Sequence, residues 1–120
     1  MTGRYASLFK LWAPAILWAA VISGLSSMPG RDIPQIDIPH IDKLVHFAEF
    51  LILGFLTLRA VKSPGSNISL AKAVILSIII ISLYAALDEW HQHFIPGRTT
   101  DIVDFIMDIT GAIAGMMLHP

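Results

Sequence analysis

The chain has 120 residues, of which 55% are hydrophobic and only 14% are charged, whereas a soluble domain carries about 25% charged residues. This composition excludes an ordinary soluble domain and indicates one compact membrane unit. The net charge of −1 supplies no basic surface for nucleic acid, and the lack of cysteine excludes disulfides, thiol nucleophiles and cysteine-ligated zinc.

Four apolar runs follow one another along the chain. At a rise of about 1.5 Å per residue, each would form a helix about 26 Å long, which spans most of a hydrocarbon core of about 30 Å. We therefore predict an all-α fold, a four-transmembrane-helix bundle, in a single domain that covers residues 1–120. The predicted helices cover about residues 11–28, 44–61, 70–87 and 102–118.

The first apolar run is interpreted as a retained helix, preceded by Arg4 and Lys10. It is longer than the apolar core of a cleaved signal peptide, which has about 7–15 residues, and no A-x-A cleavage site follows it.

Basic residues are distributed unequally between the two sides of the predicted bundle. More of them lie on the side of the termini, and the acidic residues gather on the other side. Because cytoplasmic loops carry an excess of lysine and arginine, this distribution predicts that both termini are cytoplasmic. The terminal side has Arg4, Lys10, Arg59, Lys62 and Lys72, and the other side has Arg31, Lys43 and Arg98.

The connection between the first two predicted helices contains a five-residue repeat. Ile33-Pro34-Gln35-Ile36-Asp37 is followed by Ile38-Pro39-His40-Ile41-Asp42. Prolines at this spacing exclude a helix and a strand ladder. The repeat is therefore either an extended segment that lies on the bilayer or caps the bundle, or a stiff linker.

A weaker repeat relates the two halves of the chain. Pro29-Gly30-Arg31 follows the first predicted helix, and Pro96-Gly97-Arg98 follows the third. The similarity indicates either two hairpins related by a pseudo-twofold axis or a chance match. Pro96-Gly97 also fits the centre of a type II turn from Ile95 to Arg98.

Polar side chains recur at helical spacing in three of the predicted helices. Offsets of three and four residues place the members of a stripe on one face of a helix. Because lipid does not tolerate such stripes, we expect them to face a single polar cavity that opens to the outer side. The one-face stripes are Asp42, His46 and Glu49 in the second helix and Asp101, Asp104 and Asp108 in the fourth, and the third helix ends in a polar group of Asp88, Glu89, His91, Gln92 and His93.

Some of these residues also have structural interpretations. Asp42 fits the N-cap of the second helix, and Thr100 fits the N-cap of the fourth, with Asp101 in its first turn. In a buried ion network, Arg98 would pair with Asp104 or Asp88.

Two further patterns concern packing. Gly111 and Gly115 continue the acidic face of the fourth helix and permit close approach to a neighbouring helix. Trp12, Trp18 and Trp90 are interpreted as aromatic residues at the membrane interface or facing lipid.

Acidic residues outnumber the bases Lys43 and Arg98 in the predicted cavity. Either some carboxyl groups are neutral, or the cavity holds a cation. Carboxylates and imidazole together suit a divalent metal, although no HExxH-type ligand spacing is present. No organic cofactor is predicted, and a divalent cation is one of the two ways to balance the charge.

The polar residues combine into a longer motif, which resembles the VanZ-like family of small bacterial integral membrane proteins over about residues 23–118. The resemblance implies a multi-pass protein of the inner (plasma) membrane, and it implies no established catalytic activity. The founding member of the family is associated with low-level resistance to the glycopeptide teicoplanin, which implies a role in the cell envelope. Many members have Asn at the position of Asp108, so this chain adds an acid. The motif comprises Ser26-Ser27-Met28-Pro29, Asp42-Lys43-x-x-His46-Phe47-x-x-Phe50 with Gly54, Asp88-Glu89-x-x-Gln92-x-x-x-Pro96-Gly97-Arg98, and Asp104-x-x-x-Asp108-x-x-Gly111-x-x-x-Gly115.

The leading hypothesis is a non-enzymatic envelope protein whose cavity binds the head group of a membrane lipid or another amphiphile. Arg98 and Lys43 would bind phosphate, and the acids would bind a bridging cation or an ammonium group. One alternative is an enzyme that acts on a lipid-linked envelope precursor, with His46 or Glu49 as general base and Arg98 as electrostatic clamp.

Another alternative is an ion- or proton-coupled carrier that works as a dimer. No nucleophile has an adjacent base in the sequence, so no catalytic residue is assigned, and the oligomeric state stays open. The candidate functional residues are Asp42, Lys43, His46, Glu49, Asp88, Glu89, Gln92, Arg98, Asp104 and Asp108.

Overall fold

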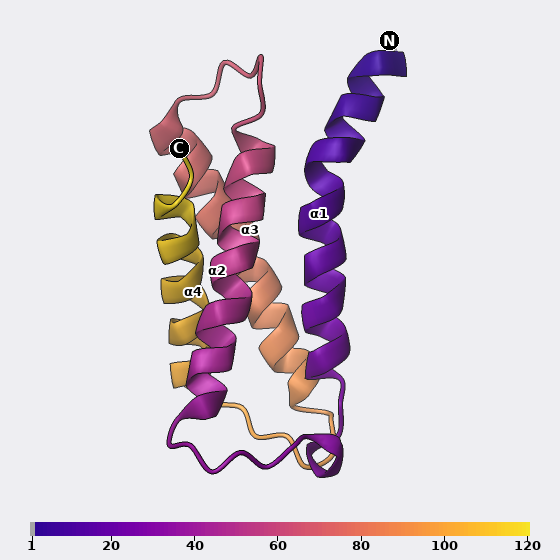
Figure 1. Cartoon of the computed structure of the whole chain (residues 1–120), viewed down its shortest axis with the longest axis vertical. Helices are drawn as coiled ribbons and strands as arrows, with labels where there is room; N and C mark the ends of the chain where they lie inside the picture. The colour runs from indigo at the N-terminus through magenta and orange to yellow at the C-terminus, as the bar shows by residue number, and fades with distance from the viewer. Residues whose placement is uncertain (1) are drawn as a thin grey trace.

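The computed structural model describes residues 2–120, and these residues form four α-helices, one short 3₁₀ turn and no strand (Figure 1). The all-α prediction is therefore confirmed. Both termini lie at one end of the bundle, together with the connection between the second and third helices. The elements are α1 (Thr2–Ser26), η1 (Gly30–Asp32), α2 (Ile41–Val61), α3 (Leu70–Gln92) and α4 (Ile102–Met117).

Three of the helices are long and apolar enough to cross a membrane. Their apolar spans have 22, 21 and 23 residues, with mean hydropathies of 1.7, 1.8 and 2.3. α4 has 16 residues and is about 24 Å long, which is shorter than a hydrocarbon core of about 30 Å. The three long helices indicate a membrane protein. They are Tyr5–Ser26 within α1, all of α2 and all of α3.

Two helices extend well beyond the apolar runs from which they were predicted. α1 begins at Thr2 and not near residue 11, so Arg4 and Lys10 lie inside the helix instead of preceding it. α3 continues past residue 87 to Gln92. Hydropathy marks where the chain becomes polar, whereas a helix continues until its backbone hydrogen bonding ends, and α1 continues even through Pro14.

The start of α2 is set by His40, whose backbone is left-handed with φ of 60°. The His40 carbonyl accepts hydrogen bonds from the amides of Lys43 at 3.1 Å and Leu44 at 3.3 Å. His40 therefore occupies the N-cap position, and the prediction that Asp42 caps this helix is wrong. Asp42 lies in the first turn instead, where the helix dipole favours an acid.

α2 and α4 are the most closely packed pair of helices. A Cβ atom on Gly111 would overlap the carbonyl of Phe47, and a Cβ atom on Gly115 would overlap the carbonyl of Leu51. The prediction of close approach at these glycines is thus confirmed, and the neighbour is α2. Glycine at these positions brings together the two helices that carry acidic stripes.

Buried apolar side chains from all four helices form one core. The core fills the middle of the bundle and leaves the polar stripes toward one end of the molecule. Its members are Ile22, Phe50, Leu53, Leu58, Ala73, Ile81, Ala85, Ala112 and Met116.

The two Pro-Gly segments contact each other at the end of the bundle opposite the termini, which we call the Pro-Gly end (Figure 1). The amide of Gly30 donates to the carbonyl of Pro96 at 2.9 Å. The amide of Arg98 donates to the carbonyl of Ile95 at 3.2 Å, and Gly97 has φ of 75°, as a type II turn requires. The type II turn is confirmed, and the similarity between the segments corresponds to a direct contact.

Candidate functional site

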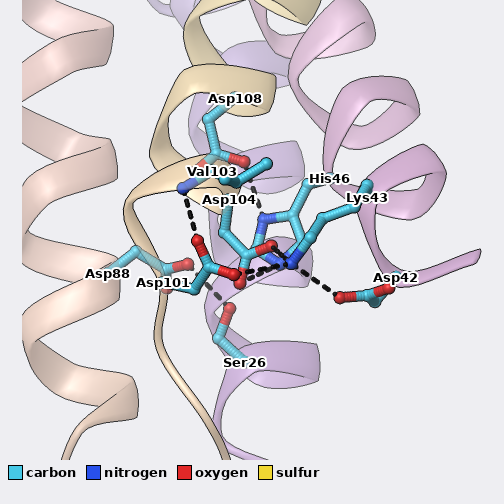
Figure 2. A network of polar contacts seen from close by, with 9 residues as sticks. All are labelled: Ser26, Asp42, Lys43, His46, Asp88, Asp101, Val103, Asp104 and Asp108. Carbon is cyan, nitrogen blue, oxygen red and sulfur yellow. Dashed lines mark hydrogen bonds and ion pairs between the residues drawn. The ribbon is translucent and has the colours of Figure 1, made fainter. Parts of the chain in front are cut away.

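Lys43 joins the polar stripes of α2 and α4. Its Nζ lies 3.0 Å from Asp42 Oδ2, 3.2 Å from Asp101 Oδ2 and 2.7 Å from Asp104 Oδ1 (Figure 2). The Asp104 side chain is only 6% exposed, so this is the buried pair of the three. Because an ammonium group has three donors and Lys43 already has three carboxylate partners, it has no donor left for a phosphate.

His46 is held one turn deeper by Asp108. The Nδ1 atom of His46 lies 2.7 Å from Asp108 Oδ1, and its Nε2 lies 4.0 Å from Asp104 Oδ2. Asp108 is completely buried, and Figure 2 shows its carboxyl group directed toward the imidazole. An imidazole held in this way can act as a base or as a metal ligand, because the carboxylate fixes its orientation.

Asp101 caps α4. Its Oδ1 accepts a hydrogen bond from the amide of Val103 at 2.6 Å, so the N-cap is Asp101 and not Thr100 as predicted. This hydrogen bond, followed by the contact with Lys43, lowers the pKa of Asp101 below its ordinary value of 3.8. Both residue types are good caps, and the helix begins one residue later than Thr100 would require.

Hydrogen bonds from α1 hold the other side of the site. Ser26 donates to Asp88 Oδ2 at 2.8 Å, and both residues are buried. Trp18 donates from Nε1 to the backbone carbonyl of Glu49 at 2.8 Å, so it ties α1 to α2 instead of only facing lipid. The hydroxyl of Tyr84 lies 2.7 Å from Ser23 Oγ. Ser23 was not singled out in the sequence, and its spacing of one helical turn from Ser26 was the available signal.

Ser27 and His91 form an exposed pair at the edge of the site. Ser27 Oγ lies 3.0 Å from His91 Nε2, although nothing near Ser27 in the sequence suggests a base. No carboxylate of residues 2–120 makes a hydrogen bond or ion pair with His91, so the third group of a catalytic triad is missing in this part of the chain.

A cavity of about 530 Å³ lies at the Pro-Gly end, within the range of about 300–1,000 Å³ that is usual for small-molecule sites. Its walls come from α1, α2, the end of α3, the start of α4 and both connections at this end. Residues 33–36 of the five-residue repeat form part of the wall, so this part of the repeat covers the bundle. The polar and charged wall residues are Ser26, Gln35, Asp42, His46, Glu49, Gln92, Arg98, Thr99 and Asp104.

Arg98 and Glu49 differ from the other charged residues of the cavity. Within residues 2–120, neither side chain makes a hydrogen bond or an ion pair. The expected partners of Arg98 are engaged elsewhere, since Asp104 contacts Lys43 and Asp88 contacts Ser26. The cavity therefore presents one cation and one anion whose hydrogen-bonding groups are available to a ligand.

Glu89 lies apart from this cavity. It lines a shallow groove between the end of α3 and the start of α4, beside Trp90 and Phe105. Its carboxylate nevertheless comes close to the deeper polar groups, because one ligand atom each from His46, Glu89 and Asp108 lie within 4.8 Å of one another. In the part of the chain that the structure describes, these three residues form the group that could hold a metal ion.

The predicted residues thus fall into four groups. Asp42, Lys43 and Asp104 form an ion cluster, and Glu49, Gln92 and Arg98 line the cavity without ion pairs. Asp88 accepts a hydrogen bond from Ser26 of α1. His46, Glu89 and Asp108 lie close together where α2, α3 and α4 meet.

Comparison with known proteins gives one result. The family model described as VanZ/LLP1 matches residues 4–120, which is almost the entire chain. No curated protein and no solved structure shows a significant match.

Proposed function

The chain belongs to the VanZ/LLP1 family, and we propose that it binds the head group of a membrane lipid, or of a comparable amphiphile, in the cavity at the Pro-Gly end. In this proposal the protein sits in the bacterial inner membrane, α4 is a fourth span, and both termini are cytoplasmic. Two facts support this arrangement: the termini lie at the same end of the bundle, and more bases lie there. The cavity then opens to the outer side.

The observation that carries the proposal is the pair of Arg98 and Glu49 in one cavity. A guanidinium and a carboxylate that face the same space, each without a side-chain partner in residues 2–120, are complementary to a ligand with both charges. Arginine is well suited to phosphate because its donors match two phosphate oxygens at once. The Glu49 carboxylate would accept hydrogen bonds from an ammonium group.

The rest of the wall fits an amphiphile. Leu25, Ile36 and Val45 line the cavity and are more than one-third exposed, so apolar surface lies beside the charged groups. A phospholipid with a phosphoethanolamine head group combines a phosphate, an ammonium and an adjoining acyl region. We therefore expect a zwitterionic lipid to bind better than an anionic one of the same chain length.

Binding is favoured over covalent catalysis by the surroundings of His46. Its only hydrogen-bond partner within residues 2–120 is Asp108, and no serine or threonine hydroxyl of that range contacts it. The hydroxyl of Ser26 is used by Asp88. Neither His46 nor Ser26 therefore belongs to a nucleophile–base pair. Ser27 and His91 do form such a pair, but no carboxylate of residues 2–120 makes a hydrogen bond or ion pair that would orient His91.

Native mass spectrometry of the protein extracted with its lipids tests the proposal. We expect wild type to retain phosphatidylethanolamine, and Arg98→Ala and Glu49→Gln to lose most of it. Arg31→Ala is the matched control, because Arg31 carries the same charge at the same end of the bundle, and its side chain is 84% exposed. Equal lipid retention by Arg98→Ala and Arg31→Ala would overturn the proposal.

A role in the cell envelope follows from the same proposal. If the bound lipid alters the outer leaflet, cells that express wild type should differ from cells that express Arg98→Ala in their sensitivity to teicoplanin. Equal sensitivity of the two strains, at equal protein levels, would contradict this role.

A further inference from the structure

Asp108 is a buried carboxyl group with an unused oxygen. The residue has 0% exposure, and its Oδ1 contacts His46, whereas its Oδ2 has no hydrogen-bond partner. Buried polar atoms are nearly always paired, because leaving one unpaired costs free energy. A buried, unpaired oxygen on the face of α4 that packs against α2 therefore points to a ligand that completes its coordination.

Glu89 has a second oxygen of the same kind. Its Oε1 is buried and has no hydrogen-bond partner, although the residue as a whole lies at the edge of a groove. Among the side chains that the structure describes, no lysine or arginine forms an ion pair with Glu89 or Asp108. Lys43, which lies one helical turn before His46 on α2, already forms ion pairs with Asp42, Asp101 and Asp104.

The geometry of the three residues fits a metal ion. One donor atom each from His46, Glu89 and Asp108 lie within 4.8 Å of one another. Metal–ligand bonds of about 2.0–2.2 Å place two ligand atoms of one ion at most about 4.4 Å apart. Side-chain shifts of under about 1 Å would therefore bring all three donor atoms within bonding distance of one ion. The three residues come from α2, α3 and α4, so the ion would lie where these helices meet.

We propose that His46, Glu89 and Asp108 bind a divalent first-row cation, such as Zn²⁺ or Mn²⁺. One imidazole and two carboxylates favour these ions over Mg²⁺ or Ca²⁺, which prefer oxygen ligands alone. His46 Nδ1 and Asp108 Oδ1 are already 2.7 Å apart, so metal binding would replace this hydrogen bond with a bond from each residue to the ion.

The ion would neutralise the buried acids and link three helices below the cavity. Three protein ligands leave at least one coordination position, which water or a cavity ligand can fill, since His46 also lines the cavity. The site does not depend on the lipid proposal. Its test uses no lipid, so the two can fail separately.

The test measures Zn²⁺ and Mn²⁺ binding by untagged, full-length protein in detergent after treatment with a chelator. We expect about one Zn²⁺ per chain by elemental analysis, saturable Mn²⁺ binding by electron paramagnetic resonance, and a higher melting temperature when either ion is added. Asp108→Asn and Glu89→Gln should each weaken binding about tenfold or more. Excess Mg²⁺ should not displace Zn²⁺.

The control variants distinguish metal binding at the proposed site from nonspecific binding to exposed acidic residues. Asp37→Asn removes an exposed acid from the repeat and should bind like wild type. Asp108→Asn keeps an oxygen for the contact with His46, and Glu89→Gln removes no hydrogen bond of the ligand-free bundle, so at least one variant should fold. A wild type that binds neither ion, or a folded Glu89→Gln that binds as tightly as Asp37→Asn, would overturn the proposal.

Discussion

Replacing Lys43 with methionine removes the charge that holds α2 to α4 and keeps the aliphatic stem. Asp104, whose side chain is 6% exposed, would then lose its partner at 2.7 Å and keep only the imidazole of His46 at 4.0 Å. Breaking a buried ion pair by removing one partner costs about 3–5 kcal/mol. Asp42 and Asp101 are 63% and 45% exposed, so water can hydrate their carboxylates when Lys43 is absent. The loss of stability therefore comes from Asp104. Since the Lys43 side chain is itself 19% exposed, we expect the free energy of unfolding to fall by about 3 kcal/mol, the lower end of this range.

Reversible unfolding in mixed detergent micelles, followed by far-ultraviolet circular dichroism, measures this loss. The double variant Lys43→Met/Asp104→Asn should recover most of it, because the unpaired charge is gone. Lys10→Met is the control, since Lys10 is exposed on α1 and its replacement should change stability by less than about 0.5 kcal/mol. A Lys43→Met variant as stable as Lys10→Met, or a double variant no more stable than Lys43→Met, would show that the ion pair between Lys43 and Asp104 does not stabilise the bundle.

Two further predictions concern the packing and the cap of α4. Gly115→Ala should destabilise the bundle by about 1–3 kcal/mol because the new Cβ overlaps the backbone of Leu51, whereas Gly24→Ala, with open space around it, should be neutral or stabilising by up to about 1 kcal/mol. Equal unfolding midpoints for the two variants would contradict the packing described for α2 and α4. The pKa of Asp101 is lowered on folding, so its ionised form stabilises the protein above pH 3.8, and this contribution is lost as the pH falls through the lower folded pKa. Wild type should therefore lose stability relative to Asp101→Asn below about pH 4 in unfolding titrations, and parallel pH profiles of the two proteins would argue against the capping role.

The features that follow a local period could be predicted from the sequence. The offsets of Asp104, Asp108, Gly111 and Gly115 place them on one face of a helix, and the structure has that face against α2. Pro96-Gly97 defined its turn because a positive φ at the second position requires glycine. The start of α1 was harder to predict, because the helix includes polar residues that precede the apolar run.

Partner choice could not be predicted, because it depends on distances across helices. Several acids compete for Lys43 and Arg98 in the sequence, and only the packed helices decide that Lys43 takes three of them. Trp18 lies in an apolar run, as a lipid-facing residue would. Its hydrogen bond to α2 depends on how α1 packs against the bundle. The same holds for Glu89, which meets His46 and Asp108 only in the folded chain.

The most direct test of the account is the accessibility of the cavity from the outer side of the membrane. The chain has no cysteine, so Thr99→Cys places a single thiol at the wall of the cavity, and Asn67→Cys places one in the connection at the opposite end. Intact spheroplasts are treated with a membrane-impermeant maleimide, before and after permeabilisation. We expect Thr99→Cys to be labelled in intact spheroplasts and Asn67→Cys to be labelled only after permeabilisation. Labelling in the reverse order would contradict a cavity that opens outward.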